Sequence, residues 1–159
     1  FGYKNDMAVP RIDKVVLNIG IGKFSADEKI LNEIIKDLTA IVGQKPVYTL
    51  AKKAISGFKI RQGLKVGLMV TLRGRRAYDF IERLIHLALP RTRDFRGIEQ
   101  KSVDQGGALN LGIREQIVFP EISHENIQQI FGMQITVKTT AKNQKEGAEL
   151  LKLLGFPIK

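Results

Sequence analysis

The chain has 159 residues, 43% of them apolar, which is enough for one globular domain with a sizeable core. Its net charge of +10 makes nucleic acid the first partner to consider and an anionic membrane surface the second. No apolar run approaches the ~20 residues of a membrane span, and the absence of cysteine excludes a disulfide framework and thiolate chemistry.

The first predicted element is a strand over residues 12–21. Apolar side chains occupy every second position from Val15 to Ile21, and the positions between them include Lys14 and Asn18. Strict alternation of this kind is typical of a strand with one buried and one solvated side. The solvated side of this strand would then present an ammonium group and an amide.

A helix is expected next, because apolar residues recur at helical spacing between Ile30 and Val42. Ser25-Ala-Asp-Glu28 has the spacing of a capping box, and Gly43 stands where a left-handed C-terminal residue is expected. The acidic residues fall outside the apolar stripe, and these are Asp27, Glu28, Glu33 and Asp37. We expect them to face water, on the side of the sheet away from its basic face.

Residues 52–76 follow a short predicted strand, Lys45–Leu50, and combine a basic, glycine-punctuated loop with a longer strand. In Lys65–Arg73 apolar side chains alternate with Lys, Gly, Met, Thr and Arg. No acid occurs between Asp37 and Asp79, whereas nine Lys or Arg do. A strand with a cationic exposed side, next to a cationic loop, favours a polyanion lying against a sheet.

The second half of the chain is predicted to contain two more strands, three helices and one long loop. In chain order these are a helix Arg75–Ala88 ended by Pro90, an irregular stretch Pro90–Gly112, a strand Arg114–Phe119, a helix Ser123–Phe131, a strand Met133–Thr140 and a terminal helix with a capping box at Asn143–Glu146. Helices on one side of a sheet can leave its other side solvated.

The solvated side of the predicted sheet carries hydrogen-bond donors and cations almost without acids. These residues are Lys14, Asn18, Lys65, Thr71, Arg73, Arg114, Gln116, Gln134, Thr136, Lys138 and Thr140. Phosphate and 2′-hydroxyl groups are well matched by such donors. Because Met69 and Thr71 stand where stacking rings would be needed on the central strand, we expect contacts to an RNA backbone or groove rather than base stacking.

Motifs for catalysis or metal binding are incomplete. The turn Gly20–Ser25 lies between a strand and a helix but lacks the third glycine of a dinucleotide loop. His86 and His124 have no Cys or carboxylate cluster at ligand spacing. We therefore predict no catalytic residue, metal or cofactor. Two alternatives stay open: an enzyme that uses the Gly20–Ser25 turn for a phosphate-bearing ligand, and a binder of nucleic acid or anionic membranes through charge alone.

Several segments carry a family resemblance. VPRIDKVVLNIGIG, GQKP, KKAISGFKIRQG, VTLRGRRAYDFIERL, LPRTRDFRG, GIREQIVFPEI and TTAK follow one another along nearly the whole chain. In this order they resemble the bacterial type of large-subunit ribosomal protein five, the 5S-rRNA-binding family. The resemblance implies an α+β fold with an antiparallel sheet, helices on one face and rRNA on the other. It makes residues 1–159 a single rRNA-binding domain, with the family's first helix upstream.

The resemblance also implies partners and sites. The protein would be a non-enzymatic constituent of the large ribosomal subunit in the bacterial cytoplasm or an organelle, placed in the central protuberance, where it contacts the P-site tRNA and small-subunit protein thirteen. The resemblance implies that Asn18, Gln44 and Thr71 bind 5S rRNA, and we expect Lys14, Lys45, Lys65 and Arg73 to bind rRNA as well. Residues of the loop that would reach tRNA are Lys53, Ser56, Lys59 and Arg61.

One segment departs from the family pattern. Bacterial relatives usually read FDGRGNYS-like where this chain reads VDQGGALN, at Val103–Asn110. An Arg and a Tyr are lost, so contacts made by those side chains are not expected here. Gly107 and Gly112 keep positions that we expect to form turns.

Overall fold

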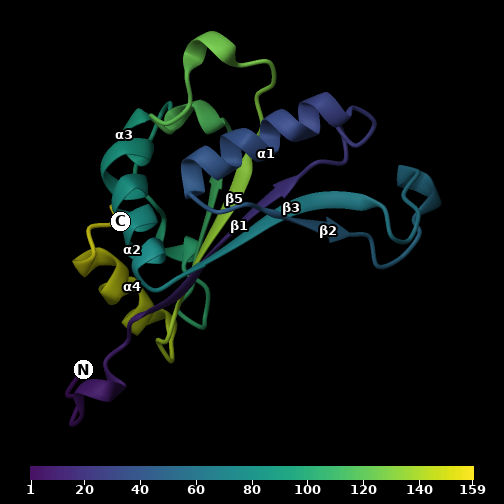
Figure 1. Cartoon of the computed structure of the whole chain (residues 1–159). Coiled ribbons are helices and arrows are strands. Elements are labelled where there is room, and N and C mark those ends of the chain that lie inside the picture. Colours follow the sequence, from purple (N-terminus) through teal and green to yellow (C-terminus); the bar gives the residue numbers. More distant parts are fainter. The chain divides into compact units, whose positions relative to one another are not determined.

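Five strands form one antiparallel sheet in the order β2-β3-β1-β5-β4, and Figure 1 traces the path of the chain through them. The strands are β1 (Ile12–Gly20), β2 (Val47–Leu50), β3 (Lys65–Arg73), β4 (Leu109–Ile113) and β5 (Met133–Thr139), and the helices are α1 (Glu28–Val42), α2 (Arg75–Arg83), α3 (Leu89–Arg91) and α4 (Gln144–Leu153). This computed structural model describes residues 1–159, apart from the side chain at position 126. The predicted α+β class is confirmed, and β1, β2, β3 and β5 lie within two residues of their predicted bounds.

The chain divides into two compact units, each with its own buried apolar residues. The first comprises Phe1–Val16, Thr71–Gly112 and Gln134–Lys159, and the second comprises Leu17–Val70 and Ile113–Met133. Fully buried residues of the first include Val15, Leu72, Phe80, Leu84, Leu109 and Leu151. Those of the second include Leu17, Ile19, Leu38, Ile41, Leu68 and Phe119.

In the second unit, α1 begins and ends at residues whose local chemistry explains its bounds. The Asp27 carboxylate accepts hydrogen bonds from the N–H groups of Lys29 (2.9 Å) and Ile30 (3.4 Å). Ser25 was the expected cap, but its hydroxyl donates to the carbonyl of Gly22 instead. Gly43 ends the helix with φ +78°, as predicted.

The apolar stripe of α1 covers one side of the neighbouring strands. Figure 1 shows α1 running alongside β1, β2 and β3. Along β1 and β3 in the second unit, alternate positions hold buried apolar residues, namely Leu17, Ile19, Leu68 and Val70. Asn18 and Lys65 alternate with them and are exposed. The predicted division of these strands into a buried and an exposed side is therefore correct.

The segment after β4 contradicts three predictions. Residues 114–119 form no strand: Gln116–Val118 is a 3-10 turn. The Gln116 side chain, expected on the exposed side of the sheet, is fully buried. Its amide donates to the carbonyl of Gln129 (2.7 Å), and its oxygen accepts from the N–H of Phe131 (3.0 Å). These bonds pair one carbonyl and one N–H of residues 129–131 without a helix, and in place of the predicted helix there is a 3-10 turn at His124–Asn126.

In the first unit, the helix that begins at Arg75 runs past its predicted end at Pro90. After α2 the chain forms a π-helical turn at Leu84–Ala88, where the N–H of Leu89 donates to the carbonyl of Leu84. This turn places Pro90 in the first turn of α3, where a missing N–H costs little. The helix therefore ends at Arg91 and not before the proline.

The stretch predicted to be irregular, residues 90–112, contains β4. Gly112 lies within this strand and forms no turn, whereas Gly107 has φ +78° and does. The buried hydroxyl of Thr139 in β5 donates to the Gly107 carbonyl (2.9 Å). Asn143 caps α4 as predicted, because its Oδ1 accepts from the N–H of Glu146 (2.9 Å), but the capping box is not complete: the Glu146 carboxylate accepts from the N–H of Lys142 (3.0 Å) and not from that of Asn143.

We predict that Gly147→Ala destabilises the protein although alanine favours helices. A Cβ at Gly147 in α4 would lie 2.5 Å from the carbonyl oxygen of Gly107, and backbone cannot rotate aside as a side chain can. Overpacking of this kind costs about 1–3 kcal/mol, against about 1 kcal/mol gained in helix propensity. Urea unfolding should therefore show a net loss. As a control, Gly22→Ala adds a methyl group where no atom lies within 4 Å and should change stability by less than about 0.5 kcal/mol.

Candidate nucleic-acid interface

In the second unit, the exposed side of the strands carries polar and cationic groups. Asn18 projects from β1 and Lys65 from the start of β3, and both are exposed. The Lys65 ammonium lies 4.3 Å from the ring centroid of Tyr48, a cation–π contact with a residue whose cross-strand partner is the buried Leu68. Beside them, Val47 and Met69 are cross-strand partners and leave apolar surface exposed. This surface combines a neutral hydrogen-bonding group, a cation and an apolar patch.

Gly67 lies at the centre of this exposed side, and sequence reasoning gave it no role. Thr49 of β2 is its cross-strand partner. A Cβ on Gly67 would lie 2.5 Å from Thr49 Oγ1 and 3.6 Å from Asn18 Oδ1. A glycine inside a strand often marks such a close approach, so Gly67 in the predicted strand was the signal in the sequence that could have identified this point. Thr49 itself could not be identified without the strand register.

The other residues implied in rRNA binding are distributed over both units. In the second unit Gln44 is half-buried and Lys45 is exposed. In the first unit, Lys14 of β1 and Thr71 of β3 are half-buried and Arg73 is exposed. Of the further donors expected on the exposed side, Thr136 bonds to Asn110 and Arg114 is exposed but lies outside any strand.

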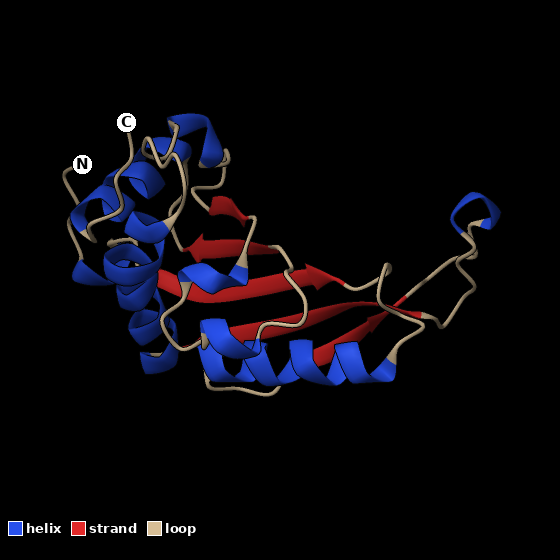
Figure 2. Cartoon of the chain, turned by 90° about the horizontal axis from the view of Figure 1, so that it is seen from above, coloured by secondary structure: helices blue, strands red, loops and turns tan.

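The loop between β2 and β3 extends beyond the ends of these two strands (Figure 2). Its tip is a small hairpin in which Ile55 and Ile60 exchange two backbone hydrogen bonds of 2.8 and 3.1 Å around a 3-10 turn. Lys59 adopts a left-handed conformation with φ +54°. Exposed side chains at and beside the tip are Lys53, Ser56, Phe58, Lys59 and Arg61. Among the described residues no acid forms an ion pair with these cations, so the loop presents free positive charge.

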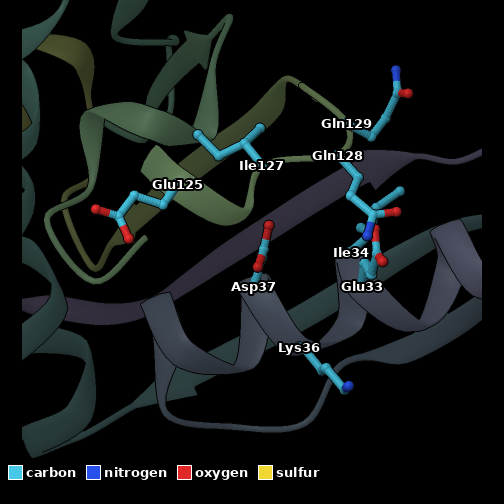
Figure 3. Close-up of a pocket in the computed structure, with 8 residues that line it drawn as sticks. All are labelled: Glu33, Ile34, Lys36, Asp37, Glu125, Ile127, Gln128 and Gln129. Carbon is cyan, nitrogen blue, oxygen red and sulfur yellow. The ribbon is translucent and has the colours of Figure 1, made fainter. Parts of the chain in front are cut away.

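Three acidic side chains line a cavity of about 520 Å³ between α1 and residues 125–129. Figure 3 shows Asp37 pointing from α1 toward the 125–129 segment, whereas Lys36 points away. The carboxylates at the cavity are Glu33, Asp37 and Glu125. Of the four acids expected to face water, Asp27 and Glu28 are exposed, whereas Glu33 and Asp37 are half-buried. Three carboxylates make this cavity unfavourable for phosphate.

Burial raises the pKa of the Asp37 carboxyl above its ordinary value. A hydrogen bond from the Gln116 side chain opposes this shift, and the nearby charge of Glu33 adds to it. A raised pKa means that folded Asp37 binds a proton more tightly than the unfolded chain does. The charged form is therefore the unfavourable one in the fold, and this carboxylate costs stability at neutral pH.

The described residues show no site that favours either of the two open alternatives, an enzyme with a phosphate-binding turn or a binder of nucleic acid or membranes through charge alone. In the part of the chain that the structure describes, no group of His, Cys, Asp and Glu could hold a metal ion. No helix of the described residues is long and apolar enough to cross a membrane. The Gly20–Ser25 turn lines an open cavity of about 740 Å³ together with Phe58 and Lys59 of the loop, but no carboxylate or histidine faces it.

We predict that Asp37→Asn stabilises the protein at neutral pH. The stability of the wild type should fall as the pH rises from the ordinary carboxyl pKa near 3.8 through the raised pKa of Asp37, because the folded chain releases its proton later than the unfolded one. The Asp37→Asn variant has no titrating group at this position, so it does not lose stability in this way as the pH rises. Urea unfolding at pH 3 and pH 7 should therefore give a stability difference, variant minus wild type, that is larger at pH 7. A difference that is equal at both pH values would show that Asp37 does not titrate abnormally.

Two family models together match almost the whole chain. The model described as Ribosomal protein L5 matches residues 5–61, and the model for the C-terminus of the same ribosomal family matches residues 65–158. Members of this family are structural ribosomal proteins and not enzymes.

Full-length relatives agree with the family models. A protein of Trichodesmium erythraeum named large ribosomal subunit protein uL5 is 57% identical over 159 residues, which are all of this chain and 88% of the relative. Proteins of the same name from Heliobacterium modesticaldum and Colwellia psychrerythraea are each 52% identical with the same coverage. Because the two family models match both halves of the chain, and relatives are 52–57% identical to it over all 159 residues, the chain belongs to the ribosomal protein L5 family.

Proposed function

We propose that this protein is a structural constituent of the large ribosomal subunit that binds 5S rRNA through the exposed side of its strands. The observation that carries this proposal is the division of the second unit into two chemically different sides. Asn18 and Lys65 lie on the exposed side of β1 and β3, whereas Glu33 and Asp37 lie on α1. An RNA backbone on the exposed strands meets amide, hydroxyl and ammonium groups and avoids these carboxylates.

The mechanism of binding that we propose has two parts. Cations such as Lys45 and Lys65 neutralise phosphates and so supply salt-dependent affinity. Neutral donors such as Asn18, Gln44 and Thr71 fix the register by hydrogen bonding to ribose or base edges. Arg73 and Lys14 in the first unit provide further positive charge of the same kind. Large-subunit rRNA is the second RNA that we propose these groups bind.

The loop between β2 and β3 has a separate task in this proposal, which is to contact the P-site tRNA. Its tip is held by its own hydrogen bonds, and its cations pair with no acid in the described part of the chain. A rigid, positively charged projection suits a second RNA surface, reached only once the strands have fixed the protein to the subunit.

Placement in the ribosome follows from the family. The relatives are named as large ribosomal subunit proteins and come from bacteria, which supports the same assembly in a bacterial cytoplasm for this chain. Within it we propose a position in the central protuberance and contact with small-subunit protein thirteen. Binding of any polyanion through charge alone is the competing function, and it predicts equal affinity for 5S rRNA and unrelated RNA.

Asn18→Ala and Thr71→Ala should each weaken 5S rRNA binding while leaving its salt dependence nearly unchanged. Each variant removes a neutral donor, worth about 0.5–1.5 kcal/mol net when partnered, and no charge. Filter binding at several salt concentrations measures both quantities. Glu33→Ala is the matched control on α1 and should bind like the wild type. Unchanged affinity in both strand variants would place the RNA elsewhere.

Lys59→Ala combined with Arg61→Ala should separate the two tasks. The double variant should keep its affinity for isolated 5S rRNA but release P-site tRNA faster from assembled ribosomes. Each lost phosphate contact should also lower the salt dependence of tRNA retention, by roughly 0.7 in log–log slope on the single-strand value. A double variant that binds 5S rRNA weakly and holds tRNA normally would make the loop part of the rRNA surface.

A further inference from the structure

Two polar side chains from different strands meet above the backbone of β3. Thr49 comes from β2 and Asn18 from β1, which flank β3 on either side in the sheet. Both reach the space that a side chain at Gly67 would occupy: a Cβ there would lie 2.5 Å from Thr49 Oγ1 and 3.6 Å from Asn18 Oδ1. The missing side chain of Gly67 is what allows the amide and the hydroxyl to converge.

Neither of these side chains is satisfied by the protein itself. Among the described residues, no hydrogen bond or ion pair involves the side chain of Asn18 or of Thr49. Adjacent strands lie ~4.8 Å apart, so β1 and β2 are separated by roughly twice that distance with β3 between them. The two side chains reach toward each other over Gly67 without bonding to each other, so a third group can bridge them.

The side chains of a second pair of Asn and Thr, in the first unit, are bonded directly to each other. Asn110 of β4 and Thr136 of β5 project from adjacent strands, and the Thr136 hydroxyl donates to Asn110 Oδ1 at 2.8 Å. That pair satisfies itself and needs no ligand. The pair around Gly67 has the same two residue types but a whole strand between them, which leaves its hydrogen-bonding capacity free.

We propose that Asn18 and Thr49 form one composite site over Gly67 that binds a ribose 2′-hydroxyl. An amide and a hydroxyl can each donate and accept, and so can a ribose hydroxyl, so a single oxygen can bond to both. The absence of a side chain on Gly67, which is itself buried, leaves the room over β3 in which the two polar groups converge and can be reached by a sugar hydroxyl. This assignment rests on the proposed binding of 5S rRNA and names the group of the RNA that is recognised there.

The surroundings favour a sugar over a phosphate at this point. The two converging groups are neutral, and the Lys65 ammonium is held over the ring of Tyr48, whose cross-strand partner is the buried Leu68 rather than Gly67. The exposed pair Val47 and Met69 lies next along the same strands and offers apolar contact to a ribose ring. The site would therefore distinguish RNA from DNA, which a surface of lysines alone would not.

The test is interference mapping with 5S rRNA that carries 2′-deoxynucleotides at random positions. Wild-type protein should reject RNA that lacks the 2′-hydroxyl at a specific nucleotide. Thr49→Ala should lose that rejection and bind unmodified 5S rRNA roughly two- to tenfold more weakly, because one partnered hydroxyl is removed. Thr49→Ser restores the hydroxyl and should restore the interference. Thr136→Ala removes a hydroxyl that is already paired and should leave the pattern of the wild type unchanged.

The outcomes separate this site from the proposed function. Thr49→Ala is tolerated structurally because Thr49 is only half-buried and unbonded, and its thermal melt checks the fold. If Thr49→Ala keeps both the affinity and every interference position, the composite site is wrong while rRNA binding by the strands stands. If wild-type protein binds 5S rRNA no better than unrelated RNA, the proposed function fails and this inference fails with it.

Discussion

The exposed surface of the second unit depends on one constraint, which is that alternate residues of β1 and β3 must be buried on the side that α1 covers. Leu17, Ile19, Leu68 and Val70 occupy those positions. Each fully buried aliphatic side chain contributes about 1.5–3 kcal/mol, so the register is strongly specified. A slip of one residue would place these apolar groups in water and Asn18 and Lys65 in the core. Burial on one side therefore determines which groups are exposed on the other.

This constraint also explains where the charges lie. Acids are absent from residues 38–78, which contain β2, the loop and β3, whereas Glu33 and Asp37 belong to the cavity beside α1. The same strands bring unpaired polar groups together, because Gly67 leaves room between Asn18 and Thr49. Positive charge is spread along the exposed strands and the loop, while the neutral pair occupies one defined point. Affinity and selectivity can thus come from different residues of one surface.

Sequence reasoning identified the elements whose pattern is local. The alternation of β1, β3 and β5 and the stripe of α1 reflect burial on one side, and the resemblance supplied the family. It failed where distant contacts decide the conformation. Gln116 looked like an exposed strand residue but bonds to residues 129 and 131. Pro90 looked like a helix end, yet the π-helical turn before it accommodates the ring.

Prediction of the site had the same limit. Asn18, Lys65 and the loop cations are exposed as expected, because strand alternation and loop composition determine exposure locally. Thr49 was missed, since its position over Gly67 depends on the register of β2 against β3, which shifts between Thr49 and Leu50. No pattern within either strand reveals that register.

Lysine acetylation, followed by mass spectrometry with and without bound 5S rRNA, tests most directly whether RNA lies on the exposed strands. Four exposed lysines of the second unit report on the two sides: Lys45 just before β2, Lys65 at the start of β3, and Lys29 and Lys36 on α1. If the exposed strands hold the RNA, 5S rRNA should slow acetylation of Lys45 and Lys65 and leave Lys29 and Lys36 unchanged. Protection of Lys29 and Lys36 with free reaction at Lys65 would contradict it.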